Sequence, residues 1–130
     1  MPARNSEEPT VFVVDDNEAM RDALRAAVEI EGMQVECYGS AREFLENHDG
    51  SRRGCLVADI RMPGMSGVEL HEQLVRGGAA PPTIFITGHA TPQVTEKDRA
   101  QGVVGAFRKP FAPEKLLALI GRVIEQQRGE

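Results

Sequence analysis

The chain has 130 residues, of which 41% are hydrophobic and 27% are charged, and its formal net charge is −5. A chain of this size fits one domain with a single hydrophobic core, and its acidic balance gives no sign of the basic face that nucleic-acid binding requires. The apolar runs fall short of the roughly 20 residues of a membrane-spanning helix, and residues 1–9 lack the apolar segment of a secretory signal. We therefore expect a cytoplasmic domain over residues 10–127, without membrane contact, behind a polar and disordered tail over residues 1–9.

Apolar runs without alternation predict five strands, because strands buried on both faces of a parallel sheet lose the alternation of half-buried ones. These strands cover residues 10–14, 33–38, 54–59, 82–87 and 103–108. Apolar residues at helical spacing, each series opened by a capping residue or a proline, predict five helices. The expected first residues are Asn17 or Asp16, Ser40, Ser66, Thr91 and Pro113, and the expected ends include Gly32, Gly77 and Gln101.

Strands that alternate with helices imply an α/β fold, with a parallel sheet, helices on both faces and right-handed crossovers. Two cysteines, Cys37 and Cys55, fall inside predicted strands. There they fit small buried hydrophobic residues of a reducing compartment better than a disulfide or a metal site.

Groups with useful chemistry stand at the carboxyl ends of the predicted strands, where open α/β sheets place their sites. They are Asp15 and Asp16 after the first strand, Asp59 and Thr87 at the ends of the third and fourth, and Lys109 after the fifth. If the first and third strands are neighbours, three carboxylates lie close together and repel one another. A hard divalent cation relieves this repulsion, and Mg²⁺ suits a site with few carboxylates, water and phosphate oxygens.

This set of groups favours phosphoryl transfer. Asp59 can attack as a carboxylate nucleophile and form an acyl phosphate. The metal and Lys109 would neutralise charge on the phosphoryl oxygens, and the Thr87 hydroxyl would donate a hydrogen bond to one of them. Considered alone, each residue is explained by an ordinary structural role, as part of a turn, as a strand end or as a surface lysine. Their coincidence at four strand ends favours the phosphoryl site.

Four motifs in residues 10–127 resemble those of the response-regulator receiver domains of two-component signalling. They are VVDDN at 13–17, DIRMPGMSG at 59–67, ITGH at 86–89 and KPF at 109–111. The local sequence from Thr87, Thr-Gly-His-Ala, and the short segment between Asp59 and Thr87 are most similar to the nitrogen-fixation-regulator branch of that family.

The resemblance implies a flavodoxin-like sheet of five parallel strands in the order 2-1-3-4-5. It implies that Asp59 accepts a phosphoryl group from a partner histidine kinase. Asp16 and Asp59 would bind Mg²⁺ together with the backbone carbonyl of Arg61, and Asp15 would act mainly through metal-bound water. A cis peptide bond before Pro110 is also implied, as is a partner-binding face on the fourth helix, fifth strand and fifth helix.

One position departs from the family's pattern. Receivers usually carry an aromatic switch residue three positions before the lysine, and here that position is Ala106, with the aromatic one step along at Phe107. One step along a strand reverses the face, so we expect Phe107 to pack in the core. We hypothesise that the conspicuously polar helix at 91–101 and its entry loop, including His89, respond to modification of Asp59 instead.

Two other classes of function compete with a signalling receiver. A flavodoxin-like cofactor binder would need small residues after the first strand to hold a phosphate, and Asp15 and Asp16 stand there. An aspartate-nucleophile phosphohydrolase would need a general acid two residues after Asp59, where Arg61 stands, and a cap over an external substrate. We therefore expect a signalling domain that gains and sheds its own phosphoryl group, without an external substrate.

The sequence is compatible with three alternatives. The chain is either a stand-alone receiver that acts through an effector protein, the receiver fragment of a DNA-binding regulator, or a phosphorylation-silent interaction module. A dimer formed on phosphorylation is also open. We interpret the residues that border the site as modulators of rate and loop packing: Arg61, Met62, Met65 and His89.

Overall fold

The computed structural model describes residues 8–89 and 94–128, which form five strands and five helices in strict alternation. The strands are β1 (Thr10–Val14), β2 (Gln34–Tyr38), β3 (Gly54–Asp59), β4 (Thr83–Thr87) and β5 (Val103–Arg108). The helices are α1 (Glu18–Ile30), α2 (Ala41–Asn47), α3 (Gly67–Arg76), α4 (Glu96–Ala100) and α5 (Pro113–Arg128).

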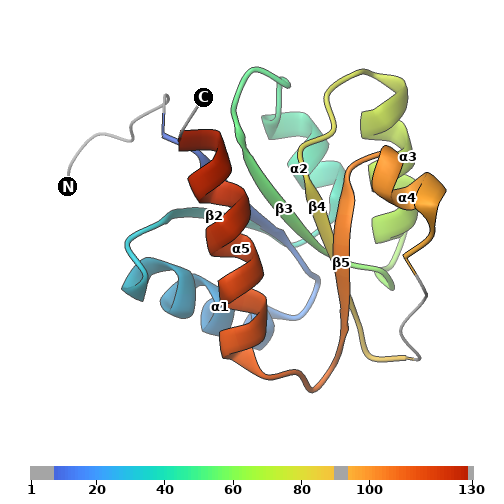
Figure 1. Cartoon of the computed structure of the whole chain (residues 1–130). Coiled ribbons are helices and arrows are strands. Elements are labelled where there is room, and N and C mark those ends of the chain that lie inside the picture. Colours follow the sequence, from blue (N-terminus) through green and yellow to red (C-terminus); the bar gives the residue numbers. More distant parts are fainter. Residues whose placement is uncertain (1–7, 90–93, 129–130) are drawn as a thin grey trace.

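The strands form one sheet in the order β2-β1-β3-β4-β5, and every neighbouring pair is parallel. Helices α1 and α5 cover one face, and α2, α3 and α4 cover the other (Figure 1). The sequence prediction of this fold class and strand order is confirmed. The order matters for the site, because β1 and β3, whose ends carry carboxylates, are direct neighbours.

Two hydrophobic clusters lie on the two faces of the sheet, and the strands divide their side chains between them. Val11 and Val13 pack against α1 and α5, whereas Phe12 and Val14 pack against α2 and α3. Every residue of β1, β3 and β4 is buried, which explains the unalternating sequence of these strands. The edge strands β2 and β5 are mostly half-buried.

Helix α4 begins later than the sequence predicts. It starts at Glu96, and Thr95 is its N-cap, with Thr95 Oγ1 accepting from the Asp98 amide at 3.1 Å and Asp98 Oδ2 accepting from the Thr95 amide at 3.0 Å. This complete capping box fixes the start of the helix, so the expected helix over 91–101 is wrong for residues 94 and 95. The expected cap at Thr91 and Pro92 lies outside the described residues.

The other boundaries differ from the predictions by a residue or two. The strands expected from residues 33 and 82 begin at Gln34 and Thr83, and the first helix takes Asn17 as its N-cap. Of the expected tail, residues 1–7 lie outside the described part, while the carbonyl of Glu8 accepts a hydrogen bond from Gln34 Nε2 at 3.1 Å. Within the described residues, no helix combines the length and the apolar character needed to span a membrane.

Both cysteines are free thiols, with Cys37 half-buried in β2 and Cys55 buried in β3. Burial raises the pKa of the fully buried Cys55 thiol to about 12, and burial also raises the pKa of the half-buried Cys37. A raised pKa keeps both groups protonated and unreactive at neutral pH. They therefore behave as small core residues.

Candidate functional site

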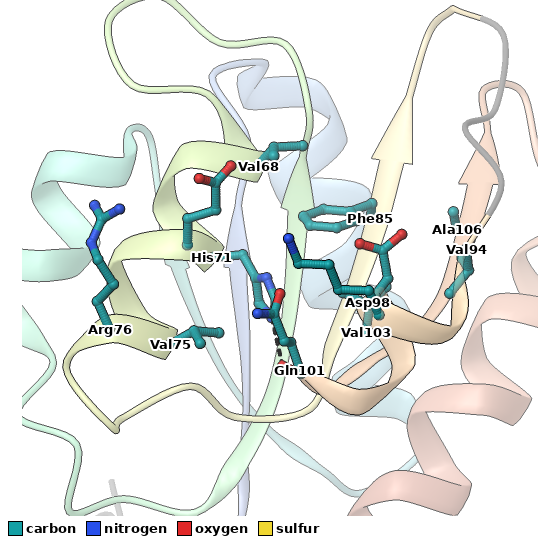
Figure 2. Close-up of a pocket in the computed structure, with 12 residues that line it drawn as sticks. Val68, His71, Val75, Arg76, Phe85, Val94, Asp98, Gln101, Val103 and Ala106 are labelled. Carbon is teal, nitrogen blue, oxygen red and sulfur yellow. Dashed lines mark hydrogen bonds between the residues drawn. The ribbon is translucent and has the colours of Figure 1, made fainter.

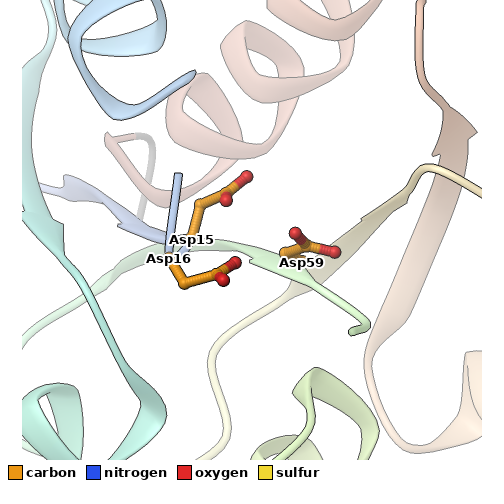
Figure 3. A group of neighbouring side chains, drawn as sticks. All are labelled: Asp15, Asp16 and Asp59. Carbon is orange, nitrogen blue, oxygen red and sulfur yellow. The ribbon is translucent and has the colours of Figure 1, made fainter. Parts of the chain in front are cut away.

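The parallel pairing of β1 and β3 brings three carboxylates to one edge of the sheet. Val14 is paired with Ala58, so Asp15 and Asp59 come next along two adjacent strands. Asp15 is 0% exposed and Asp59 is 6% exposed, whereas Asp16 is exposed. One carboxylate oxygen from each of the three lies within 4.8 Å of the others (Figure 3). The predicted acidic cluster is therefore present.

Lys109 reaches this cluster from the end of β5. Its Nζ lies 3.0 Å from Asp15 Oδ2 and 3.2 Å from Asp59 Oδ2, so one ammonium group bridges the two buried carboxylates. The Lys109 amide donates to the Thr87 carbonyl at 2.6 Å, and the peptide bond between Lys109 and Pro110 is cis, as the resemblance implies.

Backbone amides fix the second oxygen of each buried carboxylate. The Asn17 amide donates to Asp15 Oδ1 at 2.9 Å, and the Arg61 amide donates to Asp59 Oδ1 at 3.1 Å. Each carboxylate is thus held at both oxygens, by an amide two residues further along and by the shared lysine. Groups held in this way need little reorganisation before they react.

The electrostatics of the site disfavour the ionised form of Asp59. Burial raises the pKa of its carboxyl, and the neighbouring charge of Asp15 raises it further, against the opposing effect of Lys109. Burial alone would lower the pKa of Lys109, but its hydrogen bond to Asp15 and the charges of both carboxylates outweigh burial and raise it. Lys109 is therefore charged at neutral pH, and a further cation would favour ionised Asp59.

Thr87 ends β4 beside β3 and is 2% exposed. Its Oγ1 accepts a hydrogen bond from the His89 amide at 3.1 Å, which leaves the hydroxyl proton as a donor. The side chains of His89 and Arg61 are exposed beside the site, Met62 is buried and Met65 is half-buried.

The two residues that depart from the family's pattern lie on opposite faces of β5, as predicted. Phe107 packs against the α1 and α5 cluster, with its ring 6.0 Å from that of Phe111. Ala106 packs on the α3 side and is paired with Phe85 of β4. Sequence reasoning missed Phe85, although its place two residues before Thr87 puts both side chains on one face of the strand.

The pKa of Asp59 predicts a change in stability. A carboxyl whose pKa is raised on folding opposes folding once it ionises, and this cost grows as the pH rises above the unfolded value of about 3.8. We expect Asp59→Asn to raise the free energy of unfolding by about 0.5–2 kcal/mol at pH 7.5 in EDTA, with the gain disappearing near pH 3. Urea unfolding at the two pH values measures it.

A matched control is Asp49→Asn. The hydrogen bonds from Ser51 lower the pKa of the exposed Asp49 carboxyl, so its ionised form favours folding and the substitution should not stabilise the protein. Equal stability of Asp59→Asn and the wild type at pH 7.5 would contradict the electrostatic account of the site.

The fold and the acidic site define a receiver domain. A family model described as "Response regulator receiver domain" matches residues 11–121, and the chain belongs to this family. Receiver domains are signalling domains, which decides against the cofactor binder and the phosphohydrolase considered from the sequence.

Known relatives agree with this family. The response regulator protein TodT of Pseudomonas putida is 41% identical over 110 residues, which are 85% of this chain and 48% of that protein. The transcriptional regulatory protein FixJ of Bradyrhizobium diazoefficiens is 34% identical over 116 residues, 89% of this chain and 57% of FixJ. Nodulation protein W of the same organism is 37% identical over 123 residues, 95% of this chain and 54% of that protein. The chain thus spans about half the length of these relatives, and the predicted likeness to nitrogen-fixation regulators is confirmed.

Solved structures give the same result. The response regulator StyR superposes with a TM-score of 0.85 at 39% identity, covering 94% of this chain and 62% of that one. The structure titled FixJ-N superposes with a TM-score of 0.78 at 37% identity, covering 90% of this chain and 94% of that one.

Proposed function

We propose that this receiver domain, over residues 10–127, accepts a phosphoryl group on Asp59 from a sensor histidine kinase in the cytoplasm. The observation that carries the proposal is the buried pair of Asp15 and Asp59, bridged by the ammonium group of Lys109. Two buried carboxylates beside each other are unfavourable for stability, and such costs are typical of functional sites.

In the proposed reaction, a carboxylate oxygen of Asp59 attacks the phosphorus of the kinase phosphohistidine. A bond forms between that oxygen and phosphorus, the bond between phosphorus and the imidazole nitrogen breaks, and its electron pair stays on the imidazole, which takes up a proton. Lys109 neutralises charge on the transferred oxygens, and the Thr87 hydroxyl donates to one of them. Water later attacks the same phosphorus, the bond between phosphorus and the Asp59 oxygen breaks, and inorganic phosphate leaves as the Asp59 carboxylate is restored.

The donor set fits Mg²⁺. Asp15, Asp16 and Asp59 offer hard oxygen ligands within 4.8 Å of one another, and the exposed Asp16 leaves one side of the cluster open to water and phosphate oxygens. We propose that these three residues and the backbone carbonyl of Arg61 hold the ion, with Asp15 acting mainly through its bound water. When bound, Mg²⁺ would supply positive charge at the phosphoryl oxygens.

The output of the domain is proposed by analogy with its relatives. The chain spans about half the length of the matched relatives, which include a transcriptional regulatory protein. We propose that the signal passes to an output domain or an effector protein through the face formed by α4, β5 and α5, with dimer formation on phosphorylation as one outcome. Direct nucleic-acid binding by this domain is not proposed, since its net charge is −5.

The test is phosphorylation by acetyl phosphate, followed by intact mass. With Mg²⁺, the wild type should gain one phosphoryl group, and this gain should disappear in EDTA and in Asp59→Asn. Asp49→Asn, which removes an exposed carboxylate away from the site, should react like the wild type. An adduct that persists in Asp59→Asn, or no adduct on the wild type, would overturn the proposal. The second result would favour a phosphorylation-silent interaction module.

A further inference from the structure

A cavity of about 450 Å³ lies between α3 and α4 on the face of the sheet that carries Phe85 and Ala106 (Figure 2). His71 of α3 stands at its wall and reaches toward the end of α4. This histidine takes no part in the phosphoryl site, yet it is only 4% exposed.

The imidazole of His71 is held by two contacts. Its Nε2 lies 3.0 Å from the carbonyl oxygen of Gln101, the C-cap residue of α4, so Nε2–H donates to that carbonyl. Its ring also packs edge-to-face against Phe85, with centroids 5.8 Å apart and planes at 85°. A buried polar ring is stable only with a hydrogen-bond partner, and here the partner belongs to another helix.

Helix α4 has few other anchors. It has five residues, none of them buried, and its capping box joins Thr95 and Asp98 within the helix itself. Val94 packs against the core just before the helix, and the Thr83 amide donates to the Gly102 carbonyl at 2.8 Å just after it. A helix with so little buried surface belongs to the least stable part of a fold. The bond from His71 is therefore a large part of what fixes its position.

The second contact of His71, with Phe85, connects it to the strand that ends in the phosphoryl site. Phe85 lies two residues before Thr87 on β4, and the two side chains share one face of the strand. On β5 the residue paired with Phe85 is Ala106, whose methyl group leaves the adjacent space to the Phe85 and His71 rings. Phe85 therefore joins the strand that ends at Thr87 to the ring that holds α4.

We infer that His71 is a positioning residue that holds α4 against α3 in the unphosphorylated protein and releases the Gln101 carbonyl on phosphorylation. This inference rests on the proposed function and names the contact through which the site regulates its output helix. By linkage, a bond that favours the unphosphorylated arrangement also weakens the binding of a phosphoryl mimic, by the same factor.

The test compares His71→Leu, which keeps an apolar side chain but loses the donor, with His71→Gln, which keeps a donor. Glu72→Gln is the matched control, because Glu72 is exposed and lines the same cavity. Amide exchange is followed at Arg99, Gln101 and Gly102, whose amides bond within and just after α4. From the usual strength of one hydrogen bond, His71→Leu should speed their exchange by about two- to tenfold before phosphorylation. It should tighten the binding of beryllofluoride by a similar factor, and His71→Gln should restore both values.

The alternative is that His71 is only a packing residue. In that case exchange at these amides would be unchanged in His71→Leu, or equally fast in His71→Gln, and either result overturns the inference. Failure of all variants and the wild type to take a phosphoryl group would overturn the proposed function as well. Unchanged exchange in proteins that are labelled normally would overturn the His71 role alone.

If His71→Leu does not fold, a measurement on the wild-type protein tests the same inference. The nitrogen resonances of the His71 ring are recorded with and without beryllofluoride as a phosphoryl mimic. We expect a protonated Nε2 in the free protein, and a shift of its resonance when the mimic binds. A resonance that stays in place, while signals around Asp59 move, would overturn the inference.

Discussion

Replacement of Lys109 by methionine is expected to lower the free energy of unfolding by about 3–5 kcal/mol at pH 7.5 without metal, because it leaves buried charges unpaired. The same substitution should slow acyl phosphate formation by about 10²–10³-fold with saturating Mg²⁺, since it removes a charge aimed at the transferred oxygens. The geometry behind both effects is one ammonium group 3.0 Å from Asp15 and 3.2 Å from Asp59, whose side chains are 0% and 8% exposed.

The pH dependence of this effect has a defined sign. The pKa of Lys109 is raised above 10.5 in the folded protein by Asp15 and Asp59, so its contribution to stability is complete at neutral pH and is lost as the pH rises through the folded value. At acid pH, protonation of Asp59 removes the carboxylate charge that Lys109→Met leaves unpaired. The loss in free energy of unfolding caused by Lys109→Met should therefore shrink as the pH falls toward 4. Urea unfolding from pH 4 to 8 measures this.

The control for Lys109→Met is Lys115→Met on the exposed surface of α5. An exposed lysine contributes little to stability, so this variant should stay within about 0.5 kcal/mol of the wild type. Equal effects of the two substitutions, or a Lys109→Met protein as stable as the wild type in EDTA, would contradict the account of the bridged carboxylate pair.

The acidic site could be predicted from the sequence because parallel topology leaves little choice. Once apolar runs and amphipathic helices alternate, the carboxyl ends of the strands must meet at one edge. That rule gathers Asp15, Asp59, Thr87 and Lys109 at the edge, and the strand order implied by the family resemblance makes the first and third strands neighbours. The contacts of Lys109 with both carboxylates depend in addition on the path of the chain after β5, which no local pattern predicts.

The start of α4 shows why local signals were insufficient. Thr91-Pro92 and the Thr95 to Asp98 box are both legitimate helix starts, and they stand four residues apart. The reciprocal bonds between Thr95 and Asp98 mark the start in the described part of the chain. Because α4 has no buried residues, its hydrophobic pattern does not favour either of these two helix starts.

His71 could not be found from its sequence context. It stands between Leu70 and Leu74 on a helix, where one histidine is indistinguishable from a half-buried surface residue. Its hydrogen-bond partner is a backbone carbonyl 30 residues further along the chain. Every residue has such a carbonyl, so the sequence does not indicate which one accepts the bond. Only the strand register, which places Phe85 beside Ala106, shows why a ring from α3 is needed there.

Gly67→Ala is expected to combine a loss of stability with a loss of phosphorylation. A Cβ atom at this first residue of α3 would lie 2.3 Å from the carbonyl oxygen of Asp59 and 3.1 Å from the Cα of Ile60. Neither is a side chain that can rotate away, so the N-terminus of α3 or the end of β3 must move. Overpacking of this kind costs about 1–3 kcal/mol.

The same displacement acts on the nucleophile, because the backbone that must yield is that of Asp59 itself. A misplacement of about 1 Å costs up to 10²-fold in rate, so we expect labelling of Gly67→Ala by acetyl phosphate to be at least tenfold slower. Gly121→Ala is the control, since no atom outside the local backbone of α5 lies within 4 Å of the added carbon, and it should stabilise the helix by about 0.5–1 kcal/mol. If Gly67→Ala matched the wild type in both unfolding and labelling, the close approach of α3 to Asp59 would not constrain the site. If it lost stability but kept the labelling rate, the strain would be absorbed by α3, and the position of Asp59 would depend on β3 and the Arg61 amide alone.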